Sequence, residues 1–96
     1  MPRRLRAKWM TGRDDFILEF LADSGAILNK KALEINLAEI GADVSYSTIQ
    51  RRLPKLEKAG LVEQVREEGA WYQITQKGEK YLSGDFDLRE EPEPDE

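Results

Sequence analysis

Two amphipathic segments separated by a very short connection are the feature that most restricts how this chain can fold. Apolar side chains repeat at helical spacing in both segments: Leu33, Leu37 and Ile40 in the first, and Ile49, Leu53 and Leu56 in the second. Gly41 ends the first segment, because glycine readily adopts the left-handed conformation that closes a helix. Only residues 42–44 separate it from the next polar cap. Two helices joined by so tight a turn predict a helix-turn-helix.

Both segments have residues that commonly cap helices. Asn29 precedes the first, and either Ser45 or Ser47 precedes the second. Gly60 ends the second helix, which we expect over residues 45–59. Pro54 lies on the outward side of this helix. We expect a bend near residues 50–54, because proline removes one backbone hydrogen bond and crowds the preceding turn.

Further elements flank this pair. Thr11 and Asp14 form a capping pair before a helix of about residues 12–23, and Thr75 caps a short helix over residues 76–83. Residues 61–66 and 70–75 are β-prone, and the connection 67–69 ends in glycine, which predicts a hairpin with a bulged turn. Residues 27–28 could add a short strand. The expected fold is therefore α+β and mostly α: three helices, a two-stranded wing and a short C-terminal helix.

The net charge of −4 hides an uneven distribution along the 96 residues. Residues 1–84 contain 14 basic and 12 acidic side chains, whereas residues 85–96 contain one basic and seven acidic. We expect three parts: a mobile basic arm at residues 1–10, a winged helix-turn-helix domain at residues 11–84, and an acidic, disordered tail at residues 85–96. One hypothesis is that this acidic tail folds back on helix 45–59, whose outward side is basic.

The absence of histidine and cysteine restricts the chemistry of the chain. It removes the commonest general base, thiolate metal ligands and disulfides. We therefore expect no enzyme, no catalytic residues, no metal site and no cofactor. No run approaches the roughly 18 apolar residues of a membrane span, and the N-terminus lacks the apolar core of a signal peptide. We expect a cytoplasmic protein with no membrane contact and with too small a core for a small-molecule effector.

Several stretches of the chain resemble a known family. VSYSTIQRRLPKLEKAGLV (residues 44–62) is similar to the recognition helix and first wing strand of many bacterial and archaeal winged-helix regulators, and YQITQKGEKYL (residues 72–82) to their second wing strand and closing helix. WMT (9–11), AGLV (59–62) and GDFD (84–87) are most similar to the small phage-repressor-like winged-helix proteins of haloarchaea and their viruses. The resemblance covers about residues 9–87. It implies a homodimer that places helix 45–59 in the major groove of double-stranded DNA, with the wing on adjacent backbone.

The outward face of helix 45–59 carries side chains suited to this task. Arginine can donate two hydrogen bonds to guanine, and glutamine can pair with adenine. The N-terminal half of a recognition helix reaches base edges, so we expect base reading by Ser47, Gln50 and Arg51. Side chains better suited to phosphates are Tyr46, Thr48, Arg52, Lys55, Lys58 and, on the wing, Arg66. The arm could contact DNA through Arg3, Arg4 and Arg6, or remain a tail without contacts.

Two functions are compatible with these observations. The first is a sequence-specific transcriptional regulator. A repressor is favoured over an activator because no stretch resembles an activation or enzymatic domain. The alternative is a winged-helix adaptor that binds other proteins without DNA. Glu67 and Glu68 at the wing tip favour the adaptor, because carboxylates repel phosphates. The basic outward face of helix 45–59 favours the regulator. Candidate dimer interfaces are helix 12–23, the arm and the closing helix.

Overall fold

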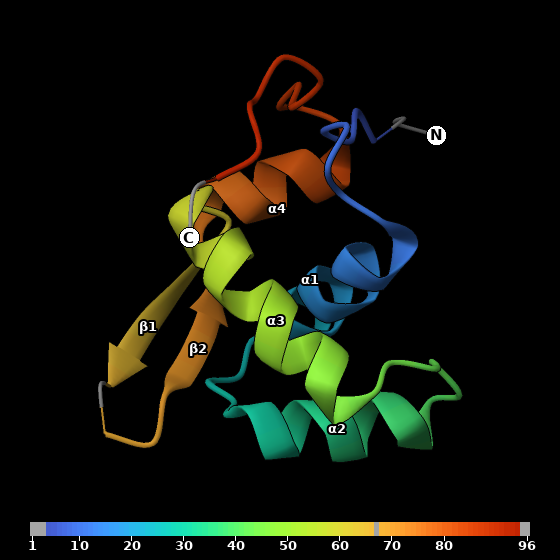
Figure 1. The fold of residues 1–96 in the computed structure, drawn as a ribbon, viewed down its shortest axis with the longest axis vertical. Coiled ribbons are helices and arrows are strands. Elements are labelled where there is room, and N and C mark those ends of the chain that lie inside the picture. The colour runs from blue at the N-terminus through green and yellow to red at the C-terminus, as the bar shows by residue number, and fades with distance from the viewer. Residues whose placement is uncertain (1–3, 67, 95–96) are drawn as a thin grey trace.

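A computed structural model describes residues 4–66 and 68–94 and shows a mostly helical domain with a small antiparallel sheet (Figure 1). The elements follow in the order α1 (Gly12–Ser24), α2 (Lys30–Glu39), α3 (Tyr46–Lys58), β1 (Val62–Arg66), β2 (Trp71–Ile74) and α4 (Gln76–Ser83). The predicted class and order of elements are confirmed.

The helix boundaries follow from the caps. Asn29 accepts a hydrogen bond from the Ala32 N–H at 2.8 Å and begins α2. Ser45, rather than Ser47, begins α3, since its hydroxyl accepts the Thr48 N–H at 3.2 Å. α3 continues as a helix through Pro54 to Lys58, and the bend expected there stays a prediction. α2 is shorter than its apolar stripe suggested: it ends at Glu39 and leaves Ile40 63% exposed.

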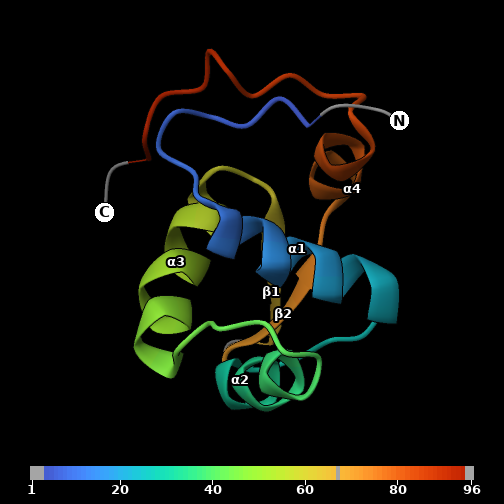
Figure 2. The same ribbon diagram turned by 90° about the vertical axis from the view of Figure 1, so that its right-hand side faces the viewer.

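The core lies where all four helices meet the sheet. Ile49, Leu53 and Leu56 of α3 are fully buried, as the helical pattern predicted. They join one buried cluster with Leu33 and Leu37 of α2 and with the buried residues of α1, which are Ile17, Leu18 and Leu21. Figure 2 shows α1 in the middle of the domain, with α3 at one side and α2 below. This packing fixes one side of α3 and leaves the other side outward.

The wing is a hairpin joined to the helical part by one further backbone pairing. β1 and β2 are antiparallel, with a register shift between Gln64 and Arg66, and Gly69 in the turn has a φ of 86°. Glu67, predicted at the wing tip, lies outside the described residues. The short strand expected at residues 27–28 is a single bridge, in which Leu28 and Tyr72 exchange two backbone hydrogen bonds of 2.9 and 2.8 Å. This bridge ties the connection between α1 and α2 to the wing.

The described residues of the arm and the tail pack on the domain, which differs from the mobile arm and disordered tail that the sequence predicted. Ala7 and Met10 of the arm are buried, and Leu88 of the tail is 1% exposed. The Leu88 N–H donates to the Leu5 carbonyl at 2.9 Å, and Figure 2 shows the two segments running alongside each other above α1. Their few apolar side chains complete the core, which outweighs the polar composition around them.

Candidate nucleic-acid interface

The exposed side of α3 carries the three side chains expected to read bases. Ser47, Gln50 and Arg51 are all exposed and lie at i, i+3 and i+4, so they share one face of the helix. Figure 1 shows α3 crossing the front of the molecule, where no other element covers it. Within the described part of the chain, the side chains of Gln50 and Arg51 make no hydrogen bond or ion pair. Their donors and acceptors are therefore available to a ligand.

The first turn of α3 is ordered by hydroxyl groups. The Ser45 hydroxyl donates to Thr48 Oγ1 at 2.9 Å and lies 3.2 Å from Ser47 Oγ. Tyr46 is 38% exposed and turns toward the start of α2, where Lys31 Nζ lies 5.9 Å from the centre of its ring. A hollow beside Tyr46 is also lined by the wing turn, at Gly69 and Ala70. Tyr46 and Thr48 thus flank the three exposed side chains.

Arg52 is paired inside the domain, and its expected contact with phosphate stays a prediction. Its Nε and Nη2 donate to the two carboxylate oxygens of Asp14 at 2.8 and 2.7 Å, and Nη2 also donates to the Trp9 carbonyl at 3.0 Å. The Arg52 side chain is 16% exposed and that of Asp14 is fully buried. The hydrogen bond with Asp14 raises the pKa of Arg52 above its ordinary value. This two-pronged contact joins the middle of α3 to the first turn of α1.

The remaining expected phosphate contacts have different surroundings. Lys55 forms an ion pair with Glu93 of the tail, and that hydrogen bond lowers the pKa of Glu93 below its ordinary value. Lys58 is exposed in the last turn of α3. Arg66 is exposed at the end of β1 and lines a hollow with the exposed Glu68. Lys58 and Arg66 are therefore exposed to solvent, and Lys55 is paired with the tail.

The arginines of the arm hold it against α1 and α4. Arg4 pairs with Glu19 at 3.1 Å and donates to the Leu82 carbonyl at 3.2 Å. Arg6 pairs with Asp15 at 2.8 Å, which raises the pKa of Arg6. Arg3 lies outside the described residues. The minor-groove role considered for Arg4 and Arg6 would require these ion pairs to break.

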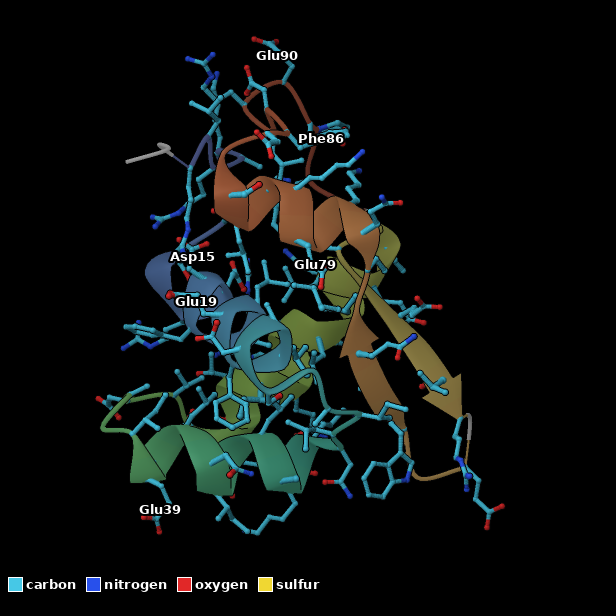
Figure 3. All side chains as sticks on the ribbon, turned by 180° about the vertical axis from the view of Figure 1, so that it is seen from behind. Asp15, Glu19, Glu39, Glu79, Phe86 and Glu90 are labelled. Atoms are coloured by element: carbon cyan, nitrogen blue, oxygen red, sulfur yellow. The ribbon has the colours of Figure 1, made fainter. Side chains whose placement is uncertain are left out.

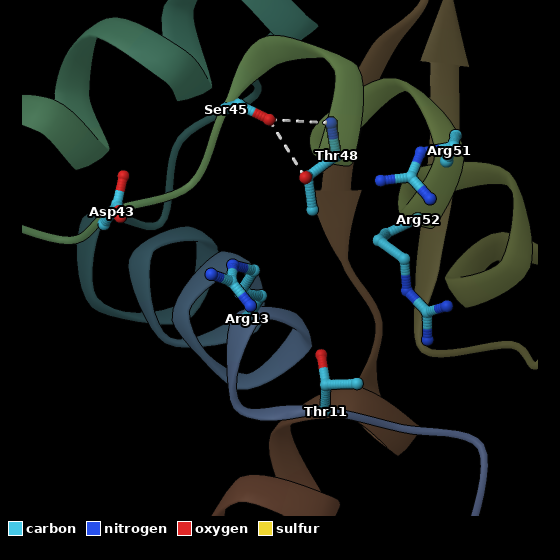
Figure 4. Close-up of a pocket in the computed structure, with 7 residues that line it drawn as sticks. All are labelled: Thr11, Arg13, Asp43, Ser45, Thr48, Arg51 and Arg52. Atoms are coloured by element: carbon cyan, nitrogen blue, oxygen red, sulfur yellow. Dashed lines mark hydrogen bonds between the residues drawn. The ribbon is translucent and has the colours of Figure 1, made fainter.

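Sequence reasoning missed Thr11 and Arg13. Both line a polar hollow of about 490 Å³ between the start of α1, the connection before α3 and the N-terminal half of α3 (Figure 4). Arg51 lines the same hollow from the other side. Arg13 lies in the basic stretch at the start of the chain, but its place beside α3 comes from packing between helices, for which no local pattern exists.

Glutamates of α1, α2, α4 and the tail lie on the side of the molecule behind α3. Figure 3 shows Glu19, Glu39, Glu79 and Glu90 on that side. Across residues 4–66 and 68–94, no group of three potential ligands could hold a metal ion. Nor is any helix in this part of the chain long and apolar enough to cross a membrane.

Comparisons with known proteins agree with this geometry. The family model described as winged helix-turn-helix phage repressor matches residues 1–94. The crystal structure of the PhiH1 repressor-like protein from Haloarcula marismortui is 32% identical, with a TM-score of 0.77 over 97% of this chain and 99% of that one. The ferric uptake regulator from Francisella tularensis, solved with iron, is 21% identical, with a TM-score of 0.63 over 70% of this chain and 53% of that one. No curated protein matches the chain.

The two structural matches carry different weight. The ferric uptake regulator shares the fold alone, because its identity is low. The Haloarcula protein matches over nearly the full length of both chains, including the arm and the tail. The resemblance drawn from residues 44–62 and 72–82 is thereby confirmed. The chain belongs to the winged helix-turn-helix phage repressor family, and it is at this level a regulator of the DNA-binding kind.

Proposed function

We propose that the protein is a cytoplasmic, homodimeric transcriptional repressor that reads double-stranded DNA with the N-terminal half of α3 in the major groove. The observation that carries this proposal is the exposed set of Ser47, Gln50 and Arg51 on a helix whose opposite side is fully buried. The repressor role rests on the family description and on the name of the Haloarcula protein.

The chemistry of these three side chains suits base edges. Arg51 can donate two parallel hydrogen bonds to guanine O6 and N7, and Gln50 can pair with adenine N6 and N7. The shorter Ser47 can donate or accept. Such contacts need a helix held in a fixed position, because small displacements weaken bidentate bonds. The buried stripe of α3 and the Arg52–Asp14 pair supply that support.

Phosphate contacts would then lie on either side of the reading helix. Tyr46 and Thr48 lie at its first turn, and Lys58 and Arg66 lie toward its C-terminal end and the wing. These contacts supply affinity without sequence preference. Arg52 acts differently in this proposal: it positions α3 through Asp14. Lys55 could join the phosphate contacts once Glu93 leaves it.

Helix α1 is the best of the three candidate dimer interfaces. The arm and α4 are partly covered by each other and by the tail, since Arg4 bonds to Leu82 and Leu5 to Leu88. α1 instead leaves Phe16 44% exposed in a groove of about 260 Å³. Phe20 and Ile40 line this groove too, together with the carboxylates of Glu19 and Asp23. A second copy seated there would bury these side chains. Phe16→Glu should give a monomer in sedimentation equilibrium, whereas Ile35→Glu, at an exposed position outside the groove, should leave the dimer intact.

The test of base reading compares Arg51→Ala with the wild type. A duplex selected from a random library by the wild-type protein serves as the specific site, and a scrambled duplex serves as competitor. Arg51→Ala should lose about 1–3 kcal/mol of specific binding and much of its sequence preference. Arg89→Ala removes a charge that pairs with Asp87 in the tail, and it should retain the preference.

Two results would contradict the proposal. Retention of the full sequence preference by Arg51→Ala would remove α3 from base reading. If the wild type bound no duplex even at low salt, the adaptor function would replace DNA binding. The exposed groove at Phe16 and Ile40 is the observation that favours the adaptor, because such exposed apolar side chains can also contact a different protein.

A further inference from the structure

The hollow beside α3 has a lining suited to an anion. Every residue that lines it is polar or charged: Thr11, Arg13, Asp43, Ser45, Thr48, Arg51 and Arg52. Figure 4 shows these side chains contributed by the start of α1, by the connection before α3 and by α3 itself. An apolar ligand would find no matching surface in such a lining.

The charges of the lining do not cancel within the domain. Arg52 is neutralised by Asp14, to which it donates two hydrogen bonds. Arg13 and Arg51 are exposed, and among residues 4–66 and 68–94 neither has an ion-pair partner. Asp43 is the single carboxylate of the lining, so one positive charge remains. A phosphodiester carries one negative charge and accepts hydrogen bonds from guanidinium groups in a planar geometry.

The hydroxyl groups of the hollow add neutral donors. Thr48 Oγ1 accepts the hydrogen bond of Ser45, which leaves the hydrogen of the Thr48 hydroxyl free to donate. Thr11 lines the opposite wall and is exposed, and its backbone N–H is already taken by Asp14. Threonine hydroxyls together with arginine side chains are common donors to DNA phosphates.

The position of the hollow identifies the source of the phosphate. Arg51 lines it and also belongs to the face proposed to enter the major groove, so the hollow lies at the edge of that face. A duplex held by Ser47, Gln50 and Arg51 would pass one strand along the start of α1. We propose that the hollow binds one backbone phosphate of the duplex, with Arg13 and Thr11 as donors to it. This inference rests on the proposed function and adds a contact outside the helix-turn-helix.

The test measures how affinity depends on salt. Duplex binding by Arg13→Gln is compared with binding by Lys80→Gln, which makes the same charge change at an exposed position of α4 outside the hollow. Arg13→Gln should weaken specific and scrambled duplexes equally, on the order of three- to tenfold, and should make the slope of log K against log salt shallower by about 0.9. The preference between the two duplexes should not change.

Three outcomes separate this inference from the proposed function. If the wild type prefers its selected duplex and Arg13→Gln behaves like Lys80→Gln, the hollow holds no phosphate while base reading stands. If the wild type binds no duplex, both ideas fail. The third outcome uses inorganic phosphate as the probe. Phosphate could give saturable shifts of the Arg13 and Thr11 NMR signals while Arg13→Gln leaves duplex binding unchanged. This result would make the hollow a site for a free anion and would overturn its assignment to DNA.

Discussion

The face formed by α3 and the start of α1 differs from the layer formed by the arm and the tail in the availability of its positive charges. In the layer, Arg4, Arg6 and Arg89 each pair with a carboxylate, and the tail also holds Lys55 and Lys77. On the face, Arg13 and Arg51 have no such partner among the described residues. Both regions contain basic side chains, but most of those in the layer are already paired within the described residues, whereas Arg13 and Arg51 are not.

The neighbours Arg51 and Arg52 show this difference within one turn of helix. Arg51 is exposed, whereas Arg52 donates two hydrogen bonds to the buried carboxylate of Asp14. Removing one partner of a buried ion pair strongly lowers the free energy of unfolding, because the other partner is left charged and unpaired. An exposed pair contributes little, since water screens it. The following predictions use these contrasts, beginning with the largest expected effect.

The largest effect is expected at Asp14. Replacing Asp14 by Ala leaves the Arg52 guanidinium without its partner in a site that is mostly closed to water. The free energy of unfolding should fall by about 3–5 kcal/mol in a denaturant titration. Glu19→Ala breaks the half-exposed pair with Arg4 and should cost less than about 1 kcal/mol. Equal losses of stability in the two variants would contradict the expected difference between the buried Arg52–Asp14 pair and the more exposed Arg4–Glu19 pair.

Leu88 provides the next largest effect and tests the packing of the tail. Its side chain is 1% exposed, so Leu88→Ala should lower the free energy of unfolding by about 2–3 kcal/mol through lost burial and a residual cavity. Truncation after residue 90 keeps Leu88 and should leave the stability nearly unchanged. If both variants matched the wild type, the tail would not belong to the folded domain.

The sequence predicted the parts of the fold that depend on local patterns. The spacing of Ile49, Leu53 and Leu56 and the caps at Asn29 and Thr75 are contained within single elements. Ile40 extends the stripe of α2, but the helix ends one residue earlier. The packing of the tail was not predicted, because a single buried leucine lies among acidic residues. The burial of Leu88 against residues far away in the chain leaves no periodic pattern in the sequence.

The candidate site was predictable only in part, for a related reason. The exposed positions of α3 follow from its buried stripe, so Ser47, Gln50 and Arg51 could be selected from sequence. Arg52 could not be set apart from Arg51, because its partner Asp14 lies 38 residues earlier and already had a local role as a capping residue. Arg13 was overlooked because only the packing of α1 beside α3 brings it to the hollow.

The hydrogen bond of Tyr81 should make the stability of the fold depend on pH in the alkaline range. Its hydroxyl donates to Asp15 at 2.6 Å, and burial together with this bond raises the pKa of Tyr81 above its ordinary value of 10.0. The neutral phenol therefore stabilises the fold fully below pH 10, and this contribution is lost as pH rises through the folded-state pKa. Tyr81→Phe should be less stable by about 1.5 kcal/mol at pH 8. The gap to the wild type should narrow above pH 10 in parallel denaturant titrations; a constant gap would contradict the prediction.

The smallest effect concerns the ion pair between Glu93 of the tail and Lys55 of α3. Glu93 holds Lys55, so a DNA phosphate and the tail would compete for the same ammonium group. Glu93→Gln removes the ion pair and should tighten binding to a scrambled duplex by about threefold at low salt, because one more cation becomes available. Glu90→Gln is the matched control: it makes the same charge change three residues earlier, at an exposed carboxylate that has no ion pair within residues 4–66 and 68–94. Equal tightening by both variants would mean that the tail acts through its general charge, whereas no tightening by Glu93→Gln would show that Lys55 does not meet the backbone at all.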